Sequence, residues 1–201
     1  MSKLVPEPAP SSITPSGSPL TISKGRLLVA RVVSSPNFNE RPQGEDDIDL
    51  LVIHNVSLPP EQFGGDYIEH FFCNQLDENA HPYFKTIVDL QVSAHLLITR
   101  EGEIIQFVPF GARAWHAGRS YFNGREECND YSIGIELEGA DTIAYTDTQY
   151  RVLADVTHAI LHYYPRITKQ RIVGHSEIAP TRKTDPGEAF NWTRYFELLE
   201  S

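Results

Sequence analysis

The sequence predicts an α/β (α+β) fold in which a central mixed β-sheet is flanked by helices. Three observations predict it. A nearly continuous apolar run ends at His54, which is typical of a strand covered on both faces. Residues 146–164 have apolar side chains at three- and four-residue spacing, which predicts a helix with one buried face. Strand and helix signals follow one another without strict alternation, which favours a mixed sheet.

The first half of the chain contains short apolar segments separated by turn formers. Two of them, residues 26–33 and 48–55, are rich in branched side chains and predict strands. Residues 66–75 carry aromatic and aliphatic side chains on one side and predict a short helix. Residues 92–98 and 104–108 flank a turn that contains Glu and Gly. This pattern predicts two strands joined as a hairpin.

The second half of the chain contains the strongest helix signal. Residues 132–137 predict another buried strand. The helix over residues 146–164 has Thr146 as its expected N-cap and a proline directly after its last residue. Residues 171–175 predict a further strand, and a short helix over residues 191–199 closes the chain. No internal repeat is found, so we expect a single domain.

Composition and charge exclude several functions. The chain has 201 residues, with 17 Lys and Arg against 27 Asp and Glu, so its formal net charge is −10. This charge argues against binding to nucleic acid or anionic lipid through bulk electrostatics. No apolar run approaches the roughly 20 residues that span a bilayer, so no membrane partner is expected. Two cysteines, Cys73 and Cys128, are too few for a disulfide framework, which favours a reducing compartment; the alternative is that the two pair with each other.

The N-terminal segment differs from the rest of the chain. Residues 1–19 contain five Pro and five Ser and no continuous apolar stretch of the kind found in secretory signals. Such a composition buries too little surface to offset the entropy lost on ordering. The sequence therefore predicts a flexible leader over residues 1–22 and one folded domain over residues 23–201.

Two histidines stand out from the eight in the chain because each directly follows an apolar strand. These are His54 and His175, and Asp185 lies ten residues beyond the second. Two imidazoles and a carboxylate would make a three-ligand site with an open position, as catalytic zinc requires. Zn²⁺ in such a site generates a nucleophile from water at neutral pH. The alternative is that these side chains are structural, and spacing alone does not decide between the two.

Two more side chains fit the same chemistry. Glu136 lies in the strand over residues 132–137, where a carboxylate near a metal could take a proton from its water. The alternative is a solvated sheet face or an ion pair. Lys183 precedes Asp185 by two residues, so its ammonium could stabilise an oxyanion at the metal. The alternative is an ordinary loop lysine.

Several blocks of sequence, in the same order, resemble one enzyme family. They lie at residues 51–55, 63–65, 80–84, 92–95, 113–118, 129–139 and 174–187. With them the chain, from about residue 26 to 196, resembles the zinc-dependent, AmpD-type branch of the N-acetylmuramoyl-L-alanine amidases. The resemblance implies a single domain like those of these amidases and of peptidoglycan-recognition proteins. The predicted domain over residues 23–201 would then be a zinc amidase catalytic domain.

The resemblance also implies an activity. The family cleaves the amide between the lactyl group of N-acetylmuramic acid and L-alanine of the stem peptide. The AmpD-type branch acts in the cytoplasm on small anhydro-muropeptides during peptidoglycan recycling, and in some bacteria it restrains induction of β-lactamase. The expected partner is therefore a small muropeptide, and the expected state is a monomer.

The resemblance assigns a role to each matching residue. His54, His175 and Asp185 would bind zinc, Glu136 would be the acid/base, and Lys183 would be the oxyanion partner. Three further residues would line the substrate groove: Asn55, Trp115 and His116. His95 follows a strand in another matching block, and we expect it in the core or behind the site rather than as a ligand.

Two rival functions stay open. One is a broader amidase that acts on polymeric peptidoglycan outside the cytoplasm, against which the missing signal peptide speaks. The other is a peptidoglycan-binding module without catalysis. Relatives of the latter kind lack the ligand that stands here as Asp185, so the full set of residues favours an enzyme.

Overall fold

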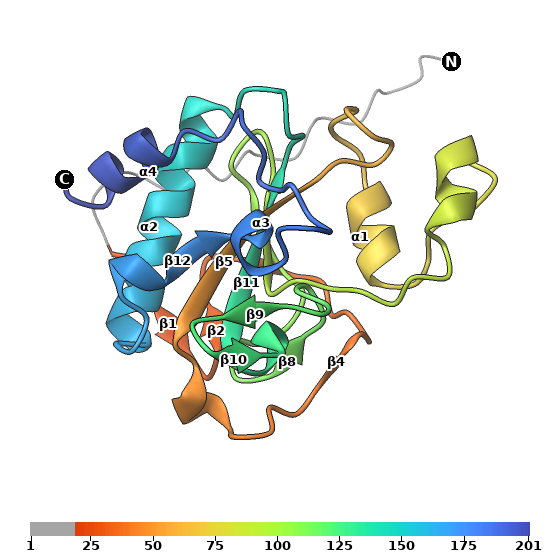
Figure 1. Ribbon diagram of the computed structural model, residues 1–201. Coiled ribbons are helices and arrows are strands. Elements are labelled where there is room, and N and C mark those ends of the chain that lie inside the picture. The colour runs from red at the N-terminus through yellow and green to blue at the C-terminus, as the bar shows by residue number, and fades with distance from the viewer. Residues whose placement is uncertain (1–18) are drawn as a thin grey trace, which may run out of the picture.

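The computed structural model describes residues 19–201, which form one layered α/β domain around a six-stranded sheet (Figure 1). The strand order is β12-β5-β11-β6-β7-β3. The strands are, in that order, β12 (Ile172–Gly174), β5 (Leu50–Val56), β11 (Ser132–Glu138), β6 (Leu96–Ile98), β7 (Ile104–Gln106) and β3 (Arg31–Val32). All neighbouring pairs are parallel except the β6–β7 hairpin. The predicted mixed sheet is confirmed.

Helices cover both faces of the sheet. α2 (Asp147–Tyr163) and α4 (Trp192–Leu198) lie on one side and α1 (Tyr67–Phe72) on the other, as Figure 1 shows. The short helix α3 (His175–Ile178) directly follows β12. None of the helices among residues 19–201 has the length and apolar character needed to cross a membrane.

Alternate residues of the central strands enter different parts of the core. Leu51 and Ile53 of β5 join the large apolar cluster beneath α2, whereas Leu50 and Val52 belong to a cluster on the opposite face. Side chains two residues apart in a strand share a face. His54 therefore points away from α2, on the same face as Val52.

α2 is the predicted long helix. Thr146 caps it: its side chain accepts the backbone N–H of Gln149, and the Gln149 side chain bonds back to the backbone of Thr146. This reciprocal capping box satisfies two N–H groups that a helix start leaves free. The helix ends at Tyr163, before the predicted stop.

The single strand predicted over residues 26–33 is wrong. The chain instead forms β2 (Arg26–Leu27), which pairs with β1 (Ile22–Ser23), and then β3 at the sheet edge. Between them the chain turns, because the N–H of Ala30 bonds to the carbonyl of Leu27. The strand predicted over residues 92–98 shortens to β6, because Ser93 bonds to Trp115 in a distant loop rather than to a strand.

Two small antiparallel pairs complete the strands: β4 (Phe38–Asn39) with β8 (Arg113–Ala114), and β9 (Tyr121–Phe122) with β10 (Arg125–Glu126). The short helices α1 and α4 confirm the two helices predicted over residues 66–75 and 191–199. Of the predicted leader, Leu20 packs against the main core and Ile22 belongs to β1. Residues 1–18 of the leader lie outside the described residues.

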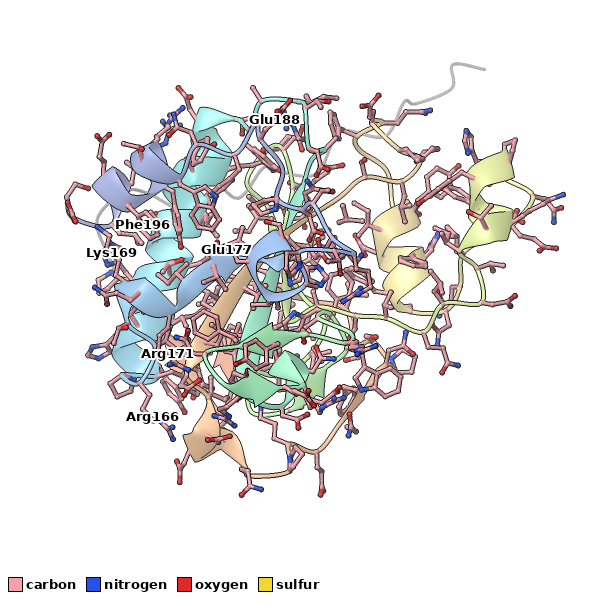
Figure 2. All side chains as sticks on the ribbon, in the orientation of Figure 1. Arg166, Lys169, Arg171, Glu177, Glu188 and Phe196 are labelled. Atoms are coloured by element: carbon pink, nitrogen blue, oxygen red, sulfur yellow. The ribbon has the colours of Figure 1, made fainter. Side chains whose placement is uncertain are left out.

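Two basic side chains just before β12 contact neighbouring elements. Figure 2 shows Lys169 beside Phe196 of α4, and the Lys169 ammonium lies 4.9 Å from the centre of that ring. Arg171 forms a 2.6 Å ion pair with Asp49, just before β5. The ion pair joins the start of β12 to the start of β5, and the Lys169 contact joins the segment before β12 to α4.

Candidate active site

Three polar side chains form a row across neighbouring parallel strands. Glu136 of β11 stands directly opposite His54 of β5 in the strand register. Gly174 of β12 pairs with Ile53, so His175 follows at the level of His54. The carboxyl ends of parallel strands meet at one edge of a sheet, which is where α/β proteins bind ligands. The register therefore gathers these side chains at one point.

Asp185 reaches this point from the loop after α3. Its carbonyl accepts the N–H of Ser176 at 3.0 Å. The next carbonyl, that of Pro186, accepts hydrogen bonds from Asn55 Nδ2 at 3.1 Å and from the Tyr145 hydroxyl at 2.7 Å. The loop is thus fixed against β5, and its carboxylate faces the two histidines.

The donor atoms of His54, His175 and Asp185 form a nearly equilateral triangle. His54 Nδ1 lies 3.0 Å from His175 Nδ1 and 3.0 Å from Asp185 Oδ2, and the third side is also 3.0 Å. Tetrahedral zinc ligands at about 2.0–2.1 Å lie roughly 3.3 Å apart. The triangle is slightly tighter than this, and a small outward shift would admit the ion. These residues fit a zinc ion.

The protonation states of this donor cluster suit a cation. Burial lowers the pKa of His54 to about 4, so its imidazole is neutral at pH 7. Burial alone would raise the pKa of Asp185, but hydrogen bonds from His175 and His54 outweigh it and lower that pKa well below its usual range. Metal ligands must be deprotonated in this way.

Glu136 has a different electrostatic environment from Asp185. Its Oε2 atom is buried and has no hydrogen-bond partner within the described part of the chain. Burial, and then the negative charge of Asp185, raise the pKa of Glu136 well above its usual value, while Lys183 opposes them. A carboxylate with a raised pKa is suited to accept a proton and return it.

A cavity of about 470 Å³ opens beside the donor cluster. Its lining includes Asn55, Glu61, Asp141, Lys183 and Asp185. The structure therefore places Lys183 and Asn55, both predicted for the site, beside Asp185. Asn55 also donates to Asp141 at 2.9 Å.

Trp115 and His116, predicted to line the groove, do not line this cavity. Trp115 is half-buried and donates through Nε1 to Asn39 at 2.6 Å. His116 is buried, and its Nδ1 lies 2.9 Å from His54 Nε2, the ring nitrogen that does not face His175 and Asp185. His95 is fully buried and stands outside the donor cluster.

Sequence reasoning missed Asn129, which supports the site from behind. Its Oδ1 accepts the backbone N–H groups of both His116 and Ala117. The available signal was its position, since it begins the matching block at residues 129–139, but no local pattern reveals which backbone groups it would bind.

The fold and this donor cluster together define a class of protein, the α/β enzymes able to hold a metal ion in an open three-ligand site at strand ends. Comparison with known proteins makes the assignment specific. Residues 44–188 match the N-acetylmuramoyl-L-alanine amidase family over most of the chain. The chain belongs to this family.

Individual proteins similar to this chain are amidases of the same family. The chain is 56% identical over 179 residues to the 1,6-anhydro-N-acetylmuramyl-L-alanine amidase AmpD of Haemophilus influenzae, covering 89% of this chain and 97% of that protein. A crystal structure of a selenomethionine AmpD derivative superposes with a TM-score of 0.87 at 54% identity, covering 90% of this chain and 99% of the other.

A third relative was solved with a muropeptide. It is the Escherichia coli amidase AmiD in complex with the substrate anhydro-N-acetylmuramic acid-L-Ala-D-γ-Glu-L-Lys. It is 30% identical with a TM-score of 0.56, and the match covers 76% of this chain and 57% of that one.

Proposed function

We propose that this amidase is zinc-dependent and hydrolyses the amide between anhydro-N-acetylmuramic acid and L-alanine of the stem peptide, in peptidoglycan recycling. The observation that carries the proposal is the 3.0 Å triangle of His54, His175 and Asp185, with Glu136 directly opposite His54 in the sheet. The names of the relatives above supply the substrate class.

The residues divide the reaction between them. Bound zinc would supply Lewis-acid activation of water and of the scissile carbonyl. Glu136 accepts a proton as the water oxygen attacks the carbonyl carbon, and its raised pKa lets it hand that proton to the departing L-alanine nitrogen. The C–N bond then breaks, leaving a lactyl carboxylate and a free peptide amine.

Lys183 and Asp185 have electrostatic roles in this scheme. The Lys183 ammonium, which lines the same cavity as Asp185, balances negative charge on the carbonyl oxygen during attack. Asp185 stays ionised, because its hydrogen bonds to two imidazoles lower its pKa. It therefore contributes a permanent negative charge to the donor cluster.

We also propose that the enzyme acts as a monomer in the cytoplasm and that its substrate is a small muropeptide. The support is the same likeness to AmpD proteins, together with a net charge of −10, which disfavours docking on an anionic wall polymer. Cell fractionation tests the location, and light scattering tests the oligomeric state. An exported protein or a stable dimer would contradict this part of the proposal.

A mass-spectrometric assay tests the activity. Purified protein is incubated with anhydro-N-acetylmuramoyl-tripeptide, with its non-anhydro analogue and with polymeric peptidoglycan, each with and without a zinc chelator. We expect free tripeptide from the anhydro compound, its loss with chelator and its return with added zinc. Equal cleavage of all three substrates would indicate a broader amidase. Zinc binding without cleavage of any would indicate a binding module.

A further inference from the structure

The two imidazoles of the donor cluster each have a second ring nitrogen, and both second nitrogens point to the same two-residue segment. His54 Nε2 lies 2.9 Å from His116 Nδ1. His175 Nε2 lies 3.0 Å from the carbonyl oxygen of Ala117. Adjacent residues of one loop therefore support both histidines from behind.

The hydrogen-bond partners determine which ring nitrogen carries the proton in His54 and in His116. If His54 offers Nδ1 to zinc, its Nε2 carries the proton and donates to His116 Nδ1. His116 Nδ1 is then an acceptor, so His116 Nε2 carries a proton. That proton is donated to Ser132 Oγ at 3.1 Å, where β11 begins. His54, His116 and Ser132 are all buried, so water does not compete for these bonds.

The sequence around His116 is built to hold this ring in place. Asn129 Oδ1 accepts the backbone N–H of His116 at 3.1 Å and that of Ala117 at 2.8 Å. On β11, Gly134 leaves room for the imidazole, because a Cβ there would lie 2.5 Å from the Cγ and Nδ1 atoms of His116. The ring thus packs directly against β11 at a position that must lack a side chain.

We propose that His116 is a positioning residue that sets the orientation and tautomer of the zinc ligand His54, with Asn129 holding His116 and Ala117 in place. This role replaces the substrate contact that the family resemblance implies for His116. It rests on the zinc dependence proposed above and goes beyond it, since partners of a ligand's second nitrogen tune metal affinity. The partner of His175 is a backbone carbonyl, so only the His54 side can be altered by a side-chain substitution.

The test is zinc affinity, measured by competition with a chromophoric chelator and without any substrate. His116→Leu places an apolar side chain of similar size there and removes the hydrogen-bond acceptor for His54 Nε2. We expect this variant to bind zinc about 10- to 100-fold more weakly. His116→Asn places Oδ1 where Nδ1 stood, and we expect it to recover most of the affinity. Equal losses in both variants, or no loss in His116→Leu, would overturn the proposal.

A matched control separates positioning from packing. His95 is also a fully buried imidazole, and it makes no hydrogen bond to a member of the donor cluster. His95→Leu should lower the melting temperature of the metal-free protein as His116→Leu does, yet leave zinc affinity within about twofold. A similar affinity loss in His95→Leu would attribute the effect to general packing and contradict the proposal.

One readout needs no variant. In zinc-loaded protein labelled with ¹⁵N at its histidines, we expect neutral His116 with its proton on Nε2, and His54 with its proton on Nε2. A proton on His116 Nδ1 would overturn the proposal even if the Leu variant failed to fold. Zinc-bound protein with this tautomer pattern but no muropeptide cleavage would refute the proposed function alone. Wild-type protein that binds no zinc would refute both.

Discussion

Two regions of the molecule meet at the donor cluster, and they differ in how they contribute to it. The carboxyl ends of β5, β11 and β12 bring His54, Glu136 and His175 to one level of the sheet. The loop segment over residues 109–131, which we call the supporting segment, reaches the same imidazoles from behind. The strands supply the groups that would touch substrate and zinc, and the supporting segment supplies the groups that orient them. Substitutions can therefore separate effects on the reaction from effects on the orientation of the zinc ligands.

The largest expected effect comes from the donor cluster itself. Asp185→Ala removes the only carboxylate of the triangle, so we expect zinc and hydrolysis to be lost together. A Lewis acid contributes several kcal/mol, so the loss of rate should be about a thousandfold or more. Zinc content by atomic absorption and peptide release by mass spectrometry measure the two effects.

Asp141 provides the matched control, because it lines the same cavity but stands outside the donor cluster. Asp141→Asn should keep its zinc. An Asp185→Ala variant that remains active without metal would disprove the ligand set.

The next effect is on the proton-transfer step. Glu136→Gln removes the proton acceptor but leaves the triangle untouched, so we expect kcat to fall about 10²- to 10⁴-fold while zinc stays bound. Glu138 is the control: it lies two residues further along the same strand face, where it accepts the N–H of Gly64 and of Arg100. Glu138→Gln should retain most activity. Equal losses in the two variants would indicate a structural role for Glu136.

A somewhat smaller effect is expected at the cavity wall. Lys183→Met removes the positive charge that would offset the oxyanion, and we expect kcat to fall about 10²- to 10³-fold with zinc affinity retained. Lys169→Met is the control, because that ammonium lies over the Phe196 ring on the outer surface. Steady-state kinetics separate kcat from KM. A change in KM alone would assign Lys183 to substrate binding rather than to the transition state.

The residues at the strand ends could be predicted from the sequence, whereas those of the supporting segment could not. The apolar runs that contain or precede His54 and Glu136 are short and rich in branched side chains, so both segments could be predicted as buried strands. Asp185 could be placed near them because it follows His175 by only ten residues. These are short-range patterns, and the structure brings the three ligand candidates together.

The supporting segment could not be read in this way. His116 and its partner His54 are 62 residues apart, and Asn129 binds backbone groups 12 and 13 residues away. Nothing local distinguishes these side chains from ordinary polar loop residues. Gly134 carried the missing information, because its lack of a side chain marks where the His116 ring lies, but only the folded structure shows that contact. The split of the strand predicted over residues 26–33 has a similar origin, since tertiary pairing overrides local apolar character.

The smallest expected effect concerns how the two regions are joined. His95 accepts the N–H of Gly134 on β11 through Nδ1 and contacts the carbonyl of Ala112 in the supporting segment through Nε2. Burial, and then the charge of Arg41, whose Nη2 lies 3.1 Å from the ring, lower the pKa of His95 to about 3. The His116 ring also faces it at 5.7 Å. This junction is therefore stable only with a neutral imidazole.

The sign of the pH effect follows from proton binding. Below a pH of about 6.5 the unfolded chain protonates His95, whereas the folded protein does so only near 3, so the free energy of unfolding falls as the pH drops through this range. Above this range His95 is neutral in both states and contributes no pH dependence. Other buried groups titrate as well. The raised pKa of Glu136 increases the free energy of unfolding as the pH drops, which opposes the effect of His95. The informative quantity is therefore the difference between wild type and His95→Asn, both metal-free.

We expect this difference to be constant above pH 7 and to shrink by about 1.5 kcal/mol between pH 6.5 and 5, measured by urea unfolding. His158→Asn, on the exposed face of α2, should show no such change. A difference that did not vary with pH would mean that His95 binds its proton as readily in the folded protein as in the unfolded chain. The strands and the supporting segment would then be joined by a charged contact rather than by a neutral one.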